Sequence, residues 1–160
     1  HANVAWTESP TEVVPGLTVT GEVPRTTAYE DTGGDFYWDE ACTQTDPIPD
    51  DQAIFFDTPS GLVVVLGCAH AGVINTMRYV QRLSDNRHIH AVIGGLHLLH
   101  ASPDRMEKTI AALRDFDVGL IAPTHCTGAR AAAQLWAAFP DRWQPCPVGT
   151  RFDFESVSDT

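Results

Sequence analysis

The chain has 160 residues, of which 43% are hydrophobic, enough to form one globular domain with a buried core. Its formal net charge is −11, with 21 acidic residues against nine arginines and the single lysine Lys108. This charge disfavours a nucleic acid or an anionic membrane as a partner, because both would need a concentrated basic patch. No apolar run approaches the roughly 20 residues that span a bilayer, so we expect a soluble protein.

Residues 1–16 contain two prolines and little periodicity, which predicts an irregular or extended lead-in. Residues 17–20 alternate apolar with polar side chains, as in a half-exposed strand. Residues 26–51 then form a long polar segment that contains the aromatic triplet FYW at 36–38. Two interpretations of this segment are open: a plain surface loop, or a lid whose aromatic side chains cover a binding site.

The rest of the chain alternates strands with helices. An antiparallel hairpin is predicted around the DTPSG turn, with strands at 52–56 and 62–66. Later strands are predicted at 89–93 and 118–122, and as a terminal strand at 148–154. Apolar spacing and capping residues predict three helices, from just after residue 70 to about 84, from 102 onward, and over 128–139. This order predicts a single layered α/β domain with helices packed on a sheet.

Three histidines follow predicted strands that end in glycine or proline: His70, His97 and His125. Side chains at the ends of adjacent strands converge on one edge of a sheet, where α/β proteins usually place their sites. Neutral imidazole is a good ligand for zinc and similar ions, and a catalytic ion needs about three protein ligands and a position for water. A lone histidine is more often an ordinary core residue, but three in this pattern favour one metal site.

The other candidate ligands fit this pattern less well. His88 and His90 stand at the entry end of their strand and are expected to be exposed, whereas His100 is expected at the surface or behind the ligands. Cys68 and Cys126 stand near favoured histidines and could act as soft ligands, but inert packing is the expected role. The absence of GxSxG, P-loop and GxGxxG patterns disfavours a serine hydrolase or a nucleotide binder.

The cysteines and the start of the chain bear on its cellular compartment and on its origin. Four widely spaced cysteines with no CxxC pair predict reduced thiols in the cytoplasm, with a disulfide as the open alternative. No signal-peptide pattern is visible at the N-terminus. The chain begins with His1 and has no methionine before Met77, which predicts a processed, cut or engineered piece of a longer product.

Five motifs resemble a known family: GLTVTGEVPR (16–25), DDQAIFF (50–56), GCAHAGVINT (67–76), VIGGLHLL (92–99) and PTHCTG (123–128). Together they resemble the metallo-β-lactamase superfamily, and within it the branch of dihydropterin-ribofuranosylaminobenzene 5′-phosphate synthase-like metallohydrolases. The resemblance extends over residues 16–154. It implies an αββα sandwich, with a mixed sheet and flanking helices, whose metal site lies at one edge between two sheets.

The resemblance also implies a set of ligands. His70 matches the third metal-binding motif of the family and His125 the last one, while His97 stands near the strand end where the superfamily usually has a bridging aspartate. Zinc is implied, as one or two ions, with manganese or iron as alternatives, and the missing aspartate argues against the usual two-metal bridge. Thr127, together with the helix N-terminus that follows it, is a candidate contact for an anionic group.

The HxHxDH motif that defines the superfamily does not occur in the 160 residues. The resemblance therefore implies the C-terminal half of a metallohydrolase domain. We expect it to bind metal weakly, to be inactive alone, and to associate with the missing N-terminal half or with a second copy as a homo-oligomer. Two functions follow. One is a metal-dependent hydrolase acting on a small phosphorylated, ester or pterin-type substrate. The other is a non-catalytic half-domain that serves as an oligomeric scaffold or binding module.

Overall fold

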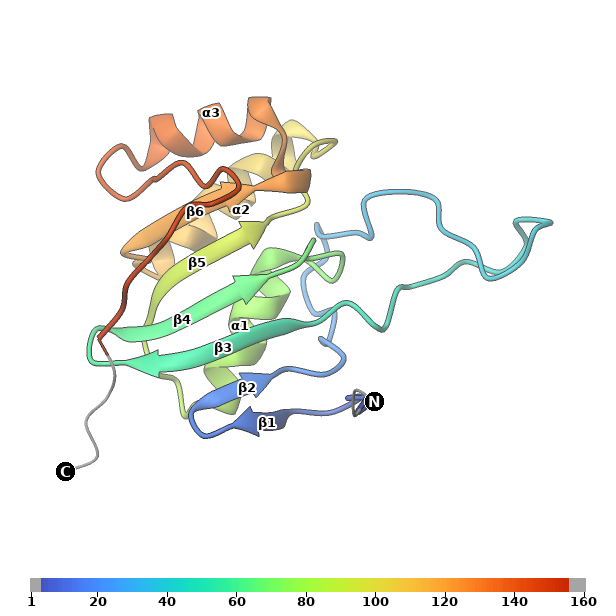
Figure 1. The fold of residues 1–160 in the computed structure, drawn as a ribbon. Coiled ribbons are helices and arrows are strands. Elements are labelled where there is room, and N and C mark those ends of the chain that lie inside the picture. The colour runs from blue at the N-terminus through green and yellow to red at the C-terminus, as the bar shows by residue number, and fades with distance from the viewer. Residues whose placement is uncertain (1–3, 156–160) are drawn as a thin grey trace.

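The computed structural model of the chain describes residues 4–155. One sheet of six strands holds them together, and its strands lie in chain order from one edge to the other (Figure 1). They are β1 (Thr11–Val14), β2 (Leu17–Val19), β3 (Ala53–Thr58), β4 (Gly61–Leu66), β5 (Ile89–Gly95) and β6 (Leu120–Thr124). Strands β1 to β4 pair antiparallel, and β4, β5 and β6 pair parallel, so the sheet is mixed.

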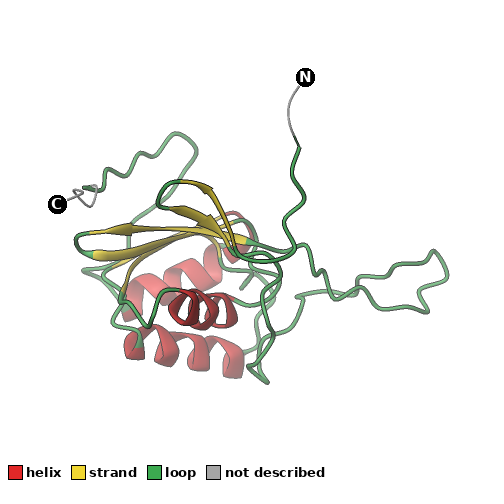
Figure 2. Ribbon diagram, turned by 90° about the horizontal axis from the view of Figure 1, so that it is seen from below, coloured by secondary structure: helices red, strands yellow, loops and turns green. Residues whose placement is uncertain are grey.

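Three helices join and follow the parallel strands, because a parallel pair needs a crossover connection. They are α1 (Val73–Leu83), α2 (Pro103–Asp115) and α3 (Ala129–Ala138), and a short 3-10 turn, η1 (His125–Thr127), precedes the last. All three helices lie on the same side of the sheet (Figure 2). Within residues 4–155, no helix is long and apolar enough to cross a membrane.

The core lies between this side of the sheet and the helices. Alternate residues of β4, including Val64, point into it and meet Ile74 and Met77 of α1, Leu113 of α2 and Leu135 of α3. These side chains are fully buried. Each contributes about 1.5–3 kcal/mol relative to an exposed position, so the helical side of the sheet is well stabilised.

The opposite side of the sheet carries no helix (Figure 2). Strand pairing places a second set of apolar side chains on it, and those that are at least partly exposed are Leu17, Val19, Ile54, Phe56, Val65, Ile93 and Leu120. The C-terminal segment runs across this side, and Phe154 packs edge-to-face on Phe56 with ring centroids 5.9 Å apart (Figure 1). We call this set of seven residues the open sheet face.

Most of the predicted elements are confirmed, and one expectation is wrong. The hairpin at 52–56 and 62–66 is β3 and β4, and the three helices form as predicted. The predicted terminal strand at 148–154 does not form, since this segment crosses the sheet without a backbone ladder. The lead-in, expected to be irregular or extended, contains the extended strand β1, whose pairing with β2 local periodicity does not reveal.

Candidate metal centre at the strand ends

The carboxyl ends of the three parallel strands lie side by side. Gly95 of β5 pairs with Thr124 of β6. The Gly95 backbone N–H also donates to the carbonyl of Gly67, just past β4, at 3.0 Å. The chain beyond each of these strand ends carries one of the predicted ligands, namely His70, His97 and His125. The three histidines therefore leave the sheet at one edge.

The backbone at this edge is strained. Ala69, His97 and His125 have φ angles of 57°, 50° and 50°, in the left-handed region that non-glycine residues rarely occupy. Each such residue costs about 1–3 kcal/mol and persists only where the surrounding structure enforces it, and these residues cluster at functional sites. Two of the three strained positions are predicted ligands.

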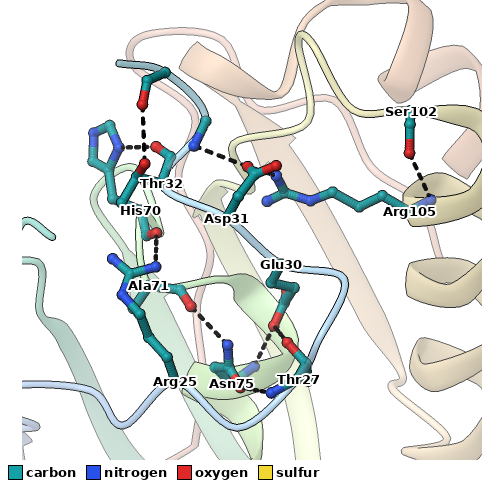
Figure 3. Close-up of polar contacts among 12 residues, drawn as sticks. Arg25, Thr27, Glu30, Asp31, Thr32, His70, Ala71, Asn75, Ser102 and Arg105 are labelled. Atoms are coloured by element: carbon teal, nitrogen blue, oxygen red, sulfur yellow. Dashed lines mark hydrogen bonds and ion pairs between the residues drawn. The ribbon is translucent and has the colours of Figure 1, made fainter. Parts of the chain in front are cut away.

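His70 is held by the loop that precedes β3. Its Nδ1 lies 2.9 Å from the carbonyl oxygen of Thr32 (Figure 3). Because a carbonyl only accepts hydrogen bonds, Nδ1 is the donor, and in the neutral ring Nε2 keeps its lone pair. Metal-ligating histidines typically have this arrangement, with one ring nitrogen oriented by a carbonyl and the other free to coordinate. Phe36 packs edge-to-face on the same ring at 5.4 Å.

His97 lies against His70, with ring centroids 4.2 Å apart. Its Nδ1 is buried and has no hydrogen-bond partner among residues 4–155. Burial lowers the pKa of His97, and the neighbouring His70 lowers it further. The ring therefore favours the neutral form. A buried imidazole nitrogen without a partner is the kind of group that a metal ion would satisfy.

His125 faces different neighbours. Its Nε2 lies 3.1 Å from Sγ of Cys68. Across the described part of the chain, one group of three has ligand atoms that all lie within 4.8 Å of one another: Cys68, His125 and Cys126. The three histidines do not form such a group. The structure therefore divides the predicted ligands into the His70–His97 pair and His125 with two cysteines.

Residues 26–51 lack helices and strands apart from a bridge between Tyr37 and Thr45, and the middle of the segment projects from the body of the sheet (Figure 1). Its two ends are fastened beside His70. Arg25 donates to the carbonyl oxygen of His70 at 2.7 Å. Asp51 accepts the backbone N–H of Ala71 at 2.8 Å. The segment thus helps to position the candidate site, whereas its role as a lid stays a prediction.

Arg105 is a feature of this region that the sequence does not predict. It lines a cavity of about 480 Å³ together with His97 and Gly33, and its side chain is 5% exposed. One guanidinium nitrogen pairs with Asp31 at 2.5 Å (Figure 3), while Nε and Nη2 are buried without a hydrogen-bond partner among residues 4–155. The apolar spacing of α2 predicts that Met106 faces the core. Nothing in the sequence marks the neighbouring Arg105 as buried.

The structure corrects or places the remaining candidates. Thr127 is 1% exposed and accepts the backbone N–H of Leu96, so its predicted contact with an anion is wrong. His88 and His100 are exposed as expected. His90 was also expected to be exposed, but it is half-buried, with Phe154 edge-to-face at 6.4 Å, because the C-terminal segment crosses above it.

Comparison with solved structures defines the class of fold. The chain superposes with a TM-score of 0.83 on a metal-dependent hydrolase of the β-lactamase superfamily, to which it is 29% identical. The match covers 94% of this chain and 58% of that structure. The fold is therefore half of an αββα metallo-β-lactamase-type sandwich, as the sequence motifs implied.

Comparison with curated sequences narrows the resemblance. The chain is 28% identical over 149 residues to 7,8-dihydropterin-6-methyl-4-(β-D-ribofuranosyl)-aminobenzene-5′-phosphate synthase of Methanocaldococcus jannaschii, covering 91% of this chain and 51% of that protein. It is 30% identical over 134 residues to an uncharacterized protein of the same organism, covering 84% of this chain and 49% of that protein. No protein-family model matches. The chain thus spans about half the length of the curated relatives it matches.

Proposed function

We propose that this chain contributes part of the metal centre of a metal-dependent enzyme acting on a small phosphorylated, ester or pterin-type substrate. The observation that carries the proposal is the His70–His97 pair, in which two imidazoles 4.2 Å apart leave the sheet at its carboxyl-end edge. Within residues 4–155, Nε2 of His70 is free of hydrogen bonds, and Nδ1 of His97 is buried without a hydrogen-bond partner. The names of two relatives, a metal-dependent hydrolase and a dihydropterin-type phosphate synthase, support the same function.

His70 and His97 would hold one ion together, and His125, which lies apart from them beside Cys68, would hold a second one. Their donor set suits zinc first and manganese or iron as alternatives, as one or two ions. A bound divalent ion supplies Lewis-acid chemistry. The chain's other residues orient the site: the carbonyl of Thr32 fixes the protonated nitrogen of His70, and Phe36 covers one side of that ring.

Arg105 supports an anionic substrate within this proposal. Two nitrogens of this guanidinium, which lies beside His97, have no partner in the described part of the chain. They would gain most from phosphate or carboxylate oxygens, which accept N–H groups in a forked geometry. The nitrogens are buried, so a small shift of the Asp31 loop must accompany binding. The local positive charge would offset the overall net charge of −11, which otherwise repels anions.

The remaining ligands would come from a segment that corresponds to the half of the relatives outside the match. The relatives are about twice as long as this chain, and the open sheet face offers an apolar surface for a second sheet. We therefore expect the 160-residue chain alone to bind metal weakly and to be inactive.

The test measures zinc affinity and hydrolysis of a chromogenic phosphodiester. Both are measured on the chain alone and on the chain co-expressed with the unmatched half of the M. jannaschii synthase. We expect activity only in the second preparation. We also expect His70→Ala and His97→Ala to weaken zinc binding at least tenfold, while His100→Ala, at an exposed histidine, leaves it unchanged. Unchanged zinc affinity in both site variants would contradict the metal role. Full activity of the chain alone would contradict the need for a second half.

The non-catalytic alternative is favoured by the open sheet face. A scaffold or binding module would use this apolar surface and would not need the histidines. It predicts that the chain associates stably without bound zinc. It also predicts that the variants His70→Ala and His97→Ala still associate. Loss of association in these variants would argue against it.

A further inference from the structure

We propose that Cys68, Cys126 and His125 form a thiolate-containing position for a thiophilic metal ion, next to the His70–His97 pair. The proposal rests on the proposed function and deepens it by assigning a second metal position beside the His70–His97 pair, and it can fail separately. The three ligand atoms lie within 4.8 Å of one another, with Nε2 of His125 3.1 Å from Sγ of Cys68. The sequence alone predicts inert packing for these two cysteines.

The fold makes room for the two sulfur atoms. Cys68 follows β4 and Cys126 follows β6, so the intervening strand β5 separates them. Gly95, the last residue of β5, lacks the side chain that would otherwise fill this space. A Cβ there would lie 2.7 Å from Sγ of Cys126 and 2.4 Å from the carbonyl oxygen of Gly67. The glycine therefore lets the two cysteines approach each other across β5.

The spacing suits coordination. Zinc bonds of about 2.3 Å to sulfur and 2.0–2.1 Å to imidazole nitrogen, in tetrahedral geometry, place ligand atoms roughly 3.5–3.8 Å apart. The three atoms are within 4.8 Å without an ion, so small side-chain movements would bring them to this geometry. Thiolate ligands select zinc, cadmium or copper(I) over magnesium, calcium or manganese.

The local environment also distinguishes these cysteines from ordinary core residues. Both are half-buried at the sheet edge, and His125 is exposed, so an ion and a fourth ligand could reach them from outside. The thiol of Cys126 donates a hydrogen bond to the carbonyl oxygen of Cys68 at 3.3 Å. Metal binding must therefore displace protons, and proton release is an expected accompaniment.

The experiment titrates the metal-free chain with cadmium(II) and follows thiolate-to-metal charge-transfer absorption in the near ultraviolet. This band reports sulfur coordination directly and does not depend on catalysis. We expect it to appear in the unmodified chain, and Cys68→Ser and Cys126→Ser each to weaken cadmium binding at least tenfold. Cys42→Ser and Cys146→Ser replace the other two thiols and are matched controls that should keep the band.

Two further variants keep the test decisive. His125→Ala changes an exposed side chain and leaves the sulfur atoms in place, so we expect weaker cadmium binding with the band retained at saturation. His70→Ala should leave the band unchanged while weakening zinc binding at the histidine pair.

Zinc binding that depends on His70 without any thiolate band would overturn this proposal and leave the proposed function standing. A thiolate band together with zinc affinity unaffected by His70→Ala and His97→Ala would support this proposal and overturn the metal role of the histidine pair. A band lost in Cys42→Ser or Cys146→Ser, but kept in the other two serine variants, would also overturn this proposal.

Discussion

At the scale of single residues, Gly33 controls where the His97 ring lies. Its φ is +77°, and a Cβ there would lie 1.8 Å from Nε2 of His97. The loop backbone therefore packs directly on the imidazole, which only glycine allows. Both the backbone conformation and the close contact favour glycine at this position.

We predict that Gly33→Ala weakens zinc binding at least tenfold, because the added methyl group must displace the His97 ring from its position against His70. The positive φ adds a loss of about 1 kcal/mol in the free energy of unfolding. Isothermal titration with zinc and urea denaturation measure the two effects. Gly16→Ala is the matched control: Gly16 has φ +80° but nothing within 4 Å of a Cβ. It should lose stability and keep its zinc affinity; an equal loss of affinity in both variants would contradict the prediction.

At the scale of elements, helix α1 begins without a side-chain cap of its own, since its N-cap residue is Gly72. Glu30 supplies the cap from the preceding loop. Its carboxylate accepts the backbone N–H groups of Ile74 at 2.9 Å and Asn75 at 2.8 Å. Asn75 Oδ1 in turn accepts the backbone N–H of Thr27 at 2.9 Å (Figure 3). The loop and the helix end therefore hold each other, next to His70.

We predict that Glu30→Ala lowers the free energy of unfolding by about 2–3 kcal/mol, because it removes a buried carboxylate from two charged hydrogen bonds at a helix N-terminus. Glu30→Gln keeps one acceptor oxygen and should lose about half as much. Urea denaturation followed by circular dichroism measures both. Glu22→Ala changes an exposed carboxylate and should cost less than about 0.5 kcal/mol. Similar losses for Glu22→Ala and Glu30→Ala would show that Glu30 does not cap the helix.

At the scale of the whole molecule, the two sides of the sheet differ. The helices cover one side, while the open sheet face keeps large apolar side chains at least partly exposed, among them Ile54 at 37%. Contiguous exposed apolar surface of this kind marks an interaction site. Its occupant, in our proposal, is the second sheet of the sandwich, from the segment that corresponds to the unmatched half of the relatives.

We predict that Ile54→Lys abolishes association with the co-expressed half of the M. jannaschii synthase, because a charge would be buried between the two sheets. Trp136→Lys is the matched control, since Trp136 is 58% exposed on α3, on the helical side of the sheet. Analytical ultracentrifugation measures both. If the chain alone forms a dimer that Ile54→Lys dissociates, the occupant is a second copy instead. If Trp136→Lys alone prevents association, the partner binds the helical side.

The sequence by itself determined the alternation of strands and helices, the antiparallel hairpin, and the placement of His70, His97 and His125 after strands. These features are local, because apolar periodicity and turn residues act over a few positions. The motif resemblance also determined the superfamily fold, which the structural match at a TM-score of 0.83 confirms.

Only the tertiary structure decided which of these residues face one another. Cys68 and His125 are 57 positions apart, Glu30 and Ile74 are 44 apart, and Asp31 and Arg105 are 74 apart. Such contacts depend on strand register and on how the loop before β3 folds back over the sheet edge. Local periodicity carries no information on either. Only the tertiary structure therefore shows the cysteines near His125, the cap that Glu30 provides to α1, and the burial of Arg105.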